Sequence, residues 1–177
     1  MNEISRNIQL RSFTENDIPL MAMLANNEKV SRNMRDGFPH PYTLEDAKGF
    51  IWICRQQDPV IALAIEFDDE YVGNIGVSIG NDVYRKSAEI GYFIGEPYWN
   101  KGIATMAVDL MIDYAFGKLG LARLHTGIFE YNPASMRVLE KCGFQKEGVF
   151  IKSVFKNGRL WNEHRYALIN PKWKHEF

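Results

Sequence analysis

Hydrophobic and polar residues change their spacing along the chain, and these changes predict its helices and strands. From Ala88 to Ile94 every second residue belongs to one apolar face, which is typical of a strand. Pro97 ends this strand, because proline has no N–H to donate to a neighbouring strand. From Ile103 onward apolar residues recur every three or four positions, as on one side of a helix. Residues 87–116 are therefore predicted to form a strand, a tight loop and a long helix, around which the rest of the chain is organised.

The same criteria assign the rest of the chain. Thr14 and Thr43 each precede an aspartate by three residues, a capping-box spacing that predicts a helix start. Asn132 is a candidate N-cap before a proline, and the Asn-Gly pair at 157–158 predicts a hairpin turn. The predicted strands are 8–11, 60–67, 71–79, 87–95, 123–129, 144–156 and 161–169. Helices are predicted after Thr14, Thr43, Gly102 and Asn132, and an irregular stretch at 31–42.

Composition and charge describe one soluble globular domain. The 177 residues are 46% hydrophobic and 24% charged, so we expect a single domain over residues 1–177 with its core at about 8–170. A formal net charge of −1 without a basic tract argues against a nucleic-acid partner. Cys54 and Cys142 are too few for a disulfide framework and fit a cytoplasmic protein. We expect no signal peptide at residues 1–3 and no membrane span.

The loop before the long helix has the features of an anion site. The first N–H groups of a helix have no internal acceptor, and the helix dipole makes this end partly positive. Gly102 has no side chain to block a ligand, Ala104 is nearly as small, and Lys101 adds a full charge. We therefore expect main-chain donors here to bind an anion such as a pyrophosphate. The loop is not a P-loop, because Gly102 follows the lysine, and the simpler alternative is that this glycine only permits a sharp turn.

Two motifs in this order resemble the acetyl-CoA-binding core of the GNAT N-acetyltransferases. They are residues 88–116, with Tyr-Trp-Asn-Lys-Gly-Ile-Ala-Thr at 98–105, and Asn-Pro-Ala-Ser-Met-Arg-Val-Leu-Glu-Lys-Cys-Gly-Phe at 132–144. More narrowly, they resemble the RimJ/RimL-like branch, which acetylates ribosomal-protein N-termini. Trp99 stands where the family usually has Gln or Arg, and Asn100 where this branch commonly has glycine. The resemblance implies an α/β (α+β) GNAT fold, a mixed and mostly antiparallel seven-stranded sheet with helices on both faces.

The resemblance also implies acetyl-CoA as the co-substrate. In the family the loop binds the pyrophosphate, here Trp99, Asn100, Lys101, Gly102, Ile103, Ala104 and Thr105. The backbone of Phe93 and Ile94 would bind the pantetheine arm where this strand splays from the 123–129 strand, and Asn132 would hydrogen-bond the same arm. Ser135, or a nearby tyrosine, would protonate the leaving thiolate. Local structure accounts for Asn132 and Ser135 equally well, as an N-cap and the residue three positions on.

Glu89 is the candidate general base. Acetyl transfer needs a neutral amine, yet a free alkylamine is mostly protonated at neutral pH, so a carboxylate must remove the proton directly or through a water. Glu89 is an acid in an otherwise apolar strand, one strand length before the loop. In related enzymes a glutamate here is often proposed as the base. The alternative is that Glu89 faces solvent or pairs with a basic residue across the sheet.

The leading hypothesis is an acetyl-CoA-dependent N-acetyltransferase that transfers the acetyl group directly, in a ternary complex, to a protein N-terminal amine or a small amine. The alternatives are a polyamine or aminoglycoside acetyltransferase and a catalytically inactive CoA-binding sensor. Polyamine sites need acidic clusters, and the acidic run at 68–70 is assigned to a turn. No pair of histidines has metal-ligand spacing, so we expect no metal. We expect a monomer or a homodimer.

Overall fold

The computed structural model describes residues 7–174, which divide into two compact units. The first unit comprises residues 7–76 and Tyr92–Leu110, and the second comprises Val77–Gly91 and residues 111–174. The boundaries fall within two strands and one helix, each of which supplies residues to both units. The single domain over 1–177 stays a prediction, and the expected absence of a signal peptide concerns residues outside those described.

Within residues 7–174, seven strands are hydrogen-bonded in the order β1-β2-β3-β4-β5-β7-β6. Their bounds are β1 Ile8–Arg11, β2 Ala62–Phe67, β3 Glu70–Ile79, β4 Ser87–Ile94, β5 Arg123–Phe129, β6 Gln145–Lys156 and β7 Arg159–Ile169. The β4–β5 pair is parallel, whereas the β1–β2, β2–β3, β5–β7 and β6–β7 pairs are antiparallel. The predicted mixed, mostly antiparallel seven-stranded sheet is confirmed.

Three of the helices in residues 7–174, α1, α3 and α5, follow the capping signals that the sequence contains. The helices of the described chain are α1 Ile18–Ala25, α2 Glu28–Ser31, α3 Leu44–Arg55, α4 Ile103–Asp113 and α5 Pro133–Lys141. The capping boxes of Thr14 and Thr43 are both present, the first opening a 3-10 turn that leads into α1. A π-helical turn, Tyr114–Lys118, continues α4. The N-terminal signals were therefore sufficient to place α1, α3 and α5.

Some boundaries differ from the sequence-based expectation. The short helix α2 was not predicted; it begins because the Asn27 side chain accepts a hydrogen bond from the Lys29 N–H at 2.8 Å. The strand β2 begins at Ala62, not at 60. The strand β7 begins at Arg159, not at 161, because a two-residue turn with φ of 52° and 76° brings it opposite Lys156. The π-helical turn was also missed, since apolar spacing alone does not separate it from an α-helix.

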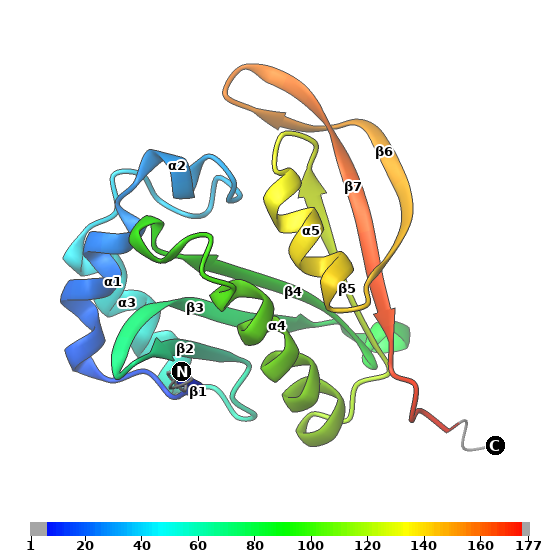
Figure 1. Cartoon of the computed structure of the whole chain (residues 1–177), viewed down its shortest axis with the longest axis horizontal. Coiled ribbons are helices and arrows are strands. Elements are labelled where there is room, and N and C mark those ends of the chain that lie inside the picture. The colour runs from blue at the N-terminus through cyan, green and yellow to red at the C-terminus, as the bar shows by residue number, and fades with distance from the viewer. Residues whose placement is uncertain (1–6, 175–177) are drawn as a thin grey trace, which may run out of the picture. The chain divides into compact units, whose positions relative to one another are not determined.

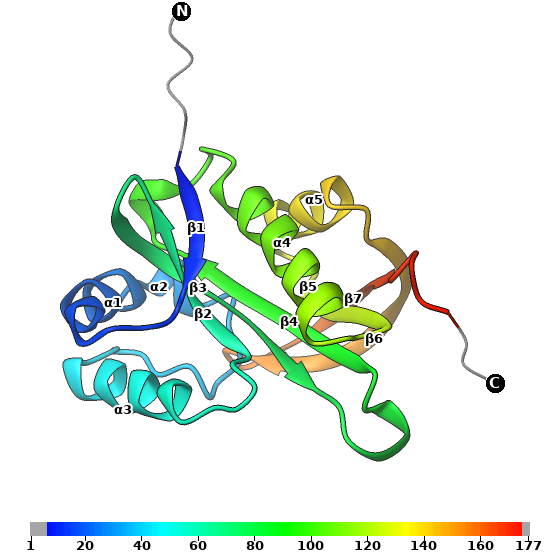
Figure 2. The same ribbon diagram turned by 90° about the horizontal axis from the view of Figure 1, so that it is seen from below.

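In the first unit, helices lie on both sides of strands β1 to β3 (Figure 2). Helices α1 and α3 lie on one side, and the beginning of α4 lies on the other. Met21 of α1 and Ala47 of α3 have no exposed surface, and Ile51 is only 2% exposed. Burying a side chain of isoleucine size stabilises a fold by about 1.5–3 kcal/mol, so this contact holds the helix pair in place.

The strands β3 and β4 approach each other closely at Gly73 of the first unit. A Cβ atom added to Gly73 would lie 2.1 Å from the carbonyl oxygen of Phe93 and 3.1 Å from the Cα of Ile94. The first distance is far below van der Waals contact. Glycine at position 73 therefore sets the spacing between β3 and the end of β4.

We expect Gly73→Ala to lower the free energy of unfolding by about 1–3 kcal/mol, because the added methyl group must push the two strands apart. Denaturant unfolding measures this change. Gly49→Ala is the matched control, since nothing lies within 4 Å of a Cβ added at that exposed position of α3. This control should be neutral or stabilising by up to about 1 kcal/mol. Equal unfolding free energies for the two variants would contradict the close approach.

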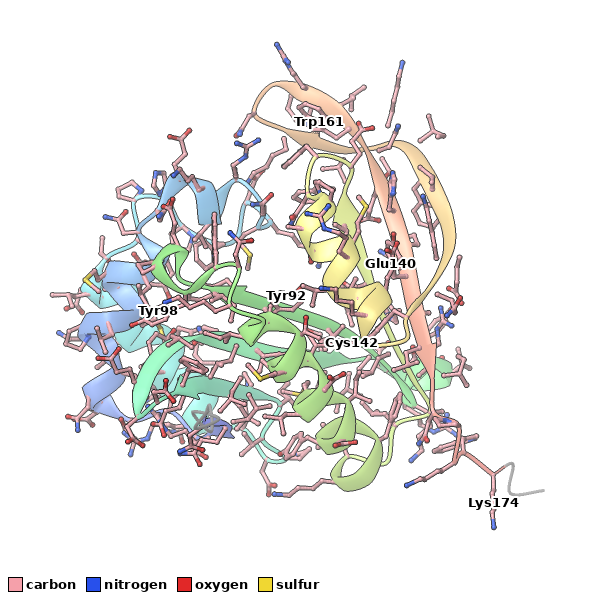
Figure 3. The ribbon with its side chains drawn as sticks, in the orientation of Figure 1. Tyr92, Tyr98, Glu140, Cys142, Trp161 and Lys174 are labelled. Atoms are coloured by element: carbon pink, nitrogen blue, oxygen red, sulfur yellow. The ribbon has the colours of Figure 1, made fainter. Side chains whose placement is uncertain are left out.

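The second unit combines α5 with β5 and the long curved hairpin of β6 and β7 (Figure 1). Leu139 of α5 and Phe144 beyond it are buried, with 0% and 2% exposure. The hydroxyl of Tyr166 in β7 donates to the Glu140 carboxylate at 2.9 Å, on the α5 residue labelled in Figure 3. Gly143 follows the helix with φ of +86°, the left-handed conformation expected of its C-terminal stop. The helix α5 is thus held against the sheet strands of its own unit.

Candidate active site

The loop before α4 contains two residues with left-handed backbone. Asn100 and Gly102 have φ of 60° and +80°, and the Met106 N–H donates to the Gly102 carbonyl at 3.1 Å, which begins the helix. Nothing lies within 4 Å of a Cβ built on Gly102. The N–H groups of Ile103 and Ala104 follow in the first helical turn, where no intrahelical acceptor exists. Gly102 therefore makes the turn and also leaves the space beside it open.

Trp99 links this loop to the end of β4. Its indole Nε1–H donates to the carbonyl oxygen of Ile94 at 2.6 Å, while 36% of the residue remains exposed. The ammonium of Lys101 lies 5.3 Å from the ring centroid of Tyr98, a cation–π contact that keeps its charge beside the beginning of the helix. The structure thus gives Trp99 a bracing role within the loop; its contact with a cofactor stays a prediction.

The backbone groups at the end of β4 point in alternating directions. The N–H of Gly95, the residue after β4, donates to the Val72 carbonyl at 2.9 Å, and the Phe93 carbonyl oxygen lies close to Gly73, so these two groups face β3. Ile94 lies between them and faces the other way. Its carbonyl accepts from Trp99 and retains a second lone pair. Of the two predicted pantetheine contacts, Ile94 thus has its backbone groups on the edge away from β3.

Glu89 lies at the last register pair between β4 and β5. In the described chain these parallel pairs are Ser87 with Arg123, Ala88 with Leu124 and Glu89 with His125. The strand β5 continues beyond this point to Phe129. Glu89 is half-buried, and Ala88 and Ile90 on either side of it are buried. The carboxylate therefore stands where the ladder ends, on the opposite face of the strand from two core residues.

His125 lies within the predicted strand 123–129, and its surroundings in β5 give its side chain a specific environment. Burial lowers the pKa of His125, and the positive charges of Arg165 and Arg123 lower it further. The carboxylates of Glu89 and Glu147 act in the opposite direction but do not reverse the shift. Neither Arg165 nor its partner Glu163 was singled out from the sequence. The alternation of residues along β5 and β7 could have indicated them, because it places His125, Arg165 and Glu163 on one face of the sheet.

The beginning of α5 has the predicted capping geometry. The Asn132 side-chain oxygen accepts a hydrogen bond from the Ser135 N–H at 3.3 Å, and both residues are half-buried. Asn132 is therefore an N-cap, as expected. Glu89, Asn132 and Ser135 all belong to the second unit, whereas Phe93, Ile94 and the loop 99–105 belong to the first. The cofactor and catalytic roles of these residues remain predictions.

Asn132→Ala should lower the free energy of unfolding by about 0.5–2 kcal/mol through the lost cap. If Asn132 also binds the cofactor, the variant should in addition bind acetyl-CoA more weakly. The control is Thr43→Ala on α3, which removes another N-cap, the acceptor of the Asp46 N–H. Thermal unfolding and acetyl-CoA titration of both variants test this. An unchanged affinity in the Asn132 variant would leave it a cap only.

Residues 7–174 contain neither a cluster of metal-ligating side chains nor a membrane-spanning helix. No group of three or more His, Cys, Asp and Glu side chains in this range is placed to hold a metal ion. None of the helices in the described range has the length and apolar character needed to span a bilayer.

Comparison with known proteins gives consistent results. A family model described as an acetyltransferase (GNAT) domain matches residues 7–145. The uncharacterized N-acetyltransferase YoaA of Bacillus subtilis is 32% identical over 168 residues, covering 92% of this chain and 93% of that protein. Spermidine N(1)-acetyltransferase of Escherichia coli is 28% identical, covering 96% and 89%. The structure of RimL, a ribosomal L7/L12 alpha-N-protein acetyltransferase in complex with coenzyme A, superposes with a TM-score of 0.81 at 20% identity, covering 94% and 96%.

Proposed function

Because the chain belongs to the GNAT acetyltransferase family and is an N-acetyltransferase, we propose that it uses acetyl-CoA and transfers the acetyl group directly to a primary amine. One observation carries this proposal: the β4–β5 ladder ends at Glu89, a half-buried carboxylate on an otherwise apolar strand. Where two strands stop pairing, an extended ligand can hydrogen-bond to the free strand edge, and the Glu89 carboxylate would then lie beside that ligand. The likeness to RimL in complex with coenzyme A is consistent with this cofactor.

The first unit supplies the groups that suit a pyrophosphate. The N–H groups of Gly102, Ile103 and Ala104 are proposed to donate to its oxygens, and the charge of Lys101 would favour the anion. The open space beside Gly102 fits a ligand that approaches the main chain closely. Trp99, Asn100 and Thr105 complete the proposed binding loop. The Ile94 backbone, on the edge of β4 that faces away from β3, is proposed to bind the pantetheine arm, whereas the predicted Phe93 contact is not retained because its carbonyl faces β3. Asn132, a residue of the second unit, is proposed to hydrogen-bond the same arm.

The second unit supplies the groups that suit proton transfer. When bound, acetyl-CoA supplies a thioester whose acetyl carbon an amine can attack. Glu89 would take one proton from the acceptor ammonium, directly or through a water. The nitrogen then forms the C–N bond as the C–S bond breaks. Ser135 would pass its proton to the leaving thiolate and regain one from the nitrogen as the amide forms, while Glu89 releases its proton to solvent, so that an amide, a thiol and one free proton result. A thiolate with an ordinary pKa near 8.5 needs little acid assistance, so Ser135 should matter less than Glu89.

The acceptor is proposed to be a protein N-terminal amine or a small amine. The relatives acetylate acceptors of both kinds, the L7/L12 N-terminus in RimL and spermidine in the Escherichia coli enzyme. The acidic run at 68–70 does not favour the alternative of a polyamine acetyltransferase, because its aspartates lie in a turn. Asp68 and Asp69 are exposed and form the two-residue turn between β2 and β3, with φ of 50° and 65°.

Steady-state release of CoA with a panel of acceptors tests the function. The panel contains peptides with free N-termini, spermidine, an aminoglycoside and simple alkylamines. Turnover with a peptide N-terminus or an alkylamine, and not with spermidine, would support the proposal. Preference for spermidine or the aminoglycoside would replace its acceptor class. Binding of acetyl-CoA without release of CoA on any acceptor would identify a sensor instead. Sedimentation of the same sample decides between monomer and homodimer.

A further inference from the structure

A polar cluster in the second unit adjoins Glu89 on one face of the strands. His125 of β5 is the register partner of Glu89, and side chains paired in this way lie on the same face of a sheet. Arg165 of β7 pairs with Gly127, two residues further along β5, so it lies diagonally across from His125. Glu163 follows on the same face of β7. Ionisable side chains from β4, β5 and β7 thus form one continuous row on this face.

The imidazole of His125 is held in one tautomer. The Arg165 Nη2 lies 3.1 Å from the His125 Nδ1. A guanidinium has only N–H donors and does not lose its proton in proteins, so Nδ1 must be the acceptor of this hydrogen bond. In the neutral imidazole the remaining proton is then on Nε2. Arg165 therefore fixes which nitrogen of His125 can donate.

The guanidinium itself is firmly positioned. Its Nη1 donates to the Glu163 carboxylate at 3.1 Å, and its carbon lies 5.5 Å from the ring centroid of Phe150. The Glu163 carboxylate occupies the space above Gly127, where an added Cβ would lie 2.2 Å from it. The side chains of Arg165 and Glu163 are only 23% and 13% exposed. A guanidinium that is packed and partly buried in this way has little freedom to move away from the imidazole.

The charges around the ring favour its neutral form near neutral pH. Burial is the largest cause of the lowered pKa of His125, and Arg165 and Arg123 act in the same direction. Glu89 on β4 and Glu147 on β6 act against them. A neutral ring with its proton on Nε2 is a hydrogen-bond donor and cannot take up a proton without losing its contact to Arg165.

We propose that His125 is a positioning residue for Glu89: Arg165 holds the imidazole as the Nε2–H tautomer, and this N–H orients the Glu89 carboxylate or the water bound to it. The inference rests on the proposed role of Glu89 as general base. It extends that role from one carboxylate to a row in which Glu163 holds Arg165, Arg165 holds His125 and His125 orients the base.

Nitrogen NMR of the histidine rings tests the tautomer without reference to activity. The wild-type His125 should give the Nε2–H pattern between pH 6 and 8. Arg165→Lys keeps the charge but cannot contact both Glu163 and the ring, so it should give mixed tautomers. Arg123→Gln is the matched control, because Arg123 is a neighbouring arginine with no hydrogen bond to the imidazole among the described contacts, and it should keep the wild-type tautomer. A wild-type ring protonated on Nδ1, or one unchanged in Arg165→Lys, would overturn the proposal.

Kinetics then tests the positioning. A glutamine can place an amide N–H near the position of Nε2, so His125→Gln should retain most of the turnover, while His125→Leu should lose about 10-fold to 100-fold, the size typical of a misplaced catalytic group. Arg165→Lys should lose a similar factor. The KM for acetyl-CoA should change in none of the three. Equal losses in His125→Gln and His125→Leu, matched by equal losses of thermal stability, would show a purely structural role.

The two proposals fail in distinguishable ways. If Glu89 is not the base, Glu89→Gln retains turnover, whatever the tautomer of His125. If Glu89 is the base but His125 does not position it, Glu89→Gln is inactive while His125→Leu keeps wild-type turnover. The second result overturns the positioning role alone.

Discussion

Glu89→Gln should lower turnover by about 10²–10⁴-fold, the usual contribution of general base catalysis, and leave the affinity for acetyl-CoA unchanged. Glutamine has the shape of glutamate but not its basicity. The defect should shrink as the pH rises, because more of the acceptor amine is then neutral without help. A pH–rate profile of wild type and variant with one accepted amine, together with acetyl-CoA titration, measures both effects.

The competing role for Glu89 is an ion pair that stabilises the sheet. That role predicts a lower thermal stability, similar turnover per folded molecule and no recovery at high pH. Glu147→Gln is a suitable control, since Glu147 is an exposed carboxylate of the same unit, paired with Arg123. It should leave turnover near the wild-type value. Parallel pH–rate profiles with a loss of less than about threefold would assign the base to a water chain or another residue.

Gly102→Val should weaken acetyl-CoA binding by more than about tenfold, which corresponds to 1.4 kcal/mol. The β-branched side chain would occupy the open space beside the first N–H groups of α4 and keep a pyrophosphate away from them. Valine also disfavours the left-handed conformation that Gly102 adopts at φ of +80°. Acetyl-CoA titration of the folded variant measures the loss of affinity.

A second glycine serves as the control that distinguishes backbone strain from the blocking of the anion site. Gly158 has nearly the same backbone, φ of +76°, and nothing within 4 Å of an added Cβ, but it lies in the β6–β7 turn. Gly158→Val should therefore lose stability without losing affinity for acetyl-CoA. If Gly102→Val folds and binds acetyl-CoA as tightly as wild type, the pyrophosphate is not bound at this loop and Gly102 only permits the turn.

Several features of this protein were readable from the sequence because their causes are local. The caps at Thr43 and Asn132 and the hairpin turn at 157–158 depend on the conformational preferences of a few adjacent residues. The order of strands and helices follows from side-chain periodicity, and the positive end of α4 follows from the helix itself. The two motifs then carried the family resemblance, which the comparisons confirmed.

Other features depend on which strands become neighbours, and a periodic pattern does not contain that information. Glu89 meets His125 only because β4 pairs with β5 in parallel and the pairing ends there. Gly73 looks like any strand glycine until its neighbour proves to be the Phe93 carbonyl. The contact between Arg165 and His125 joins residues 40 positions apart through the β5–β7 register. The sequence by itself determined the seven strands, the helices α1, α3, α4 and α5, and the candidate base, because these follow from local preferences and residue chemistry, whereas α2 and the π-helical turn were missed. Only the tertiary structure decided what surrounds that base, because the contact between Arg165 and His125 and the lowered pKa of this imidazole arise from charges and burial that folding brings together.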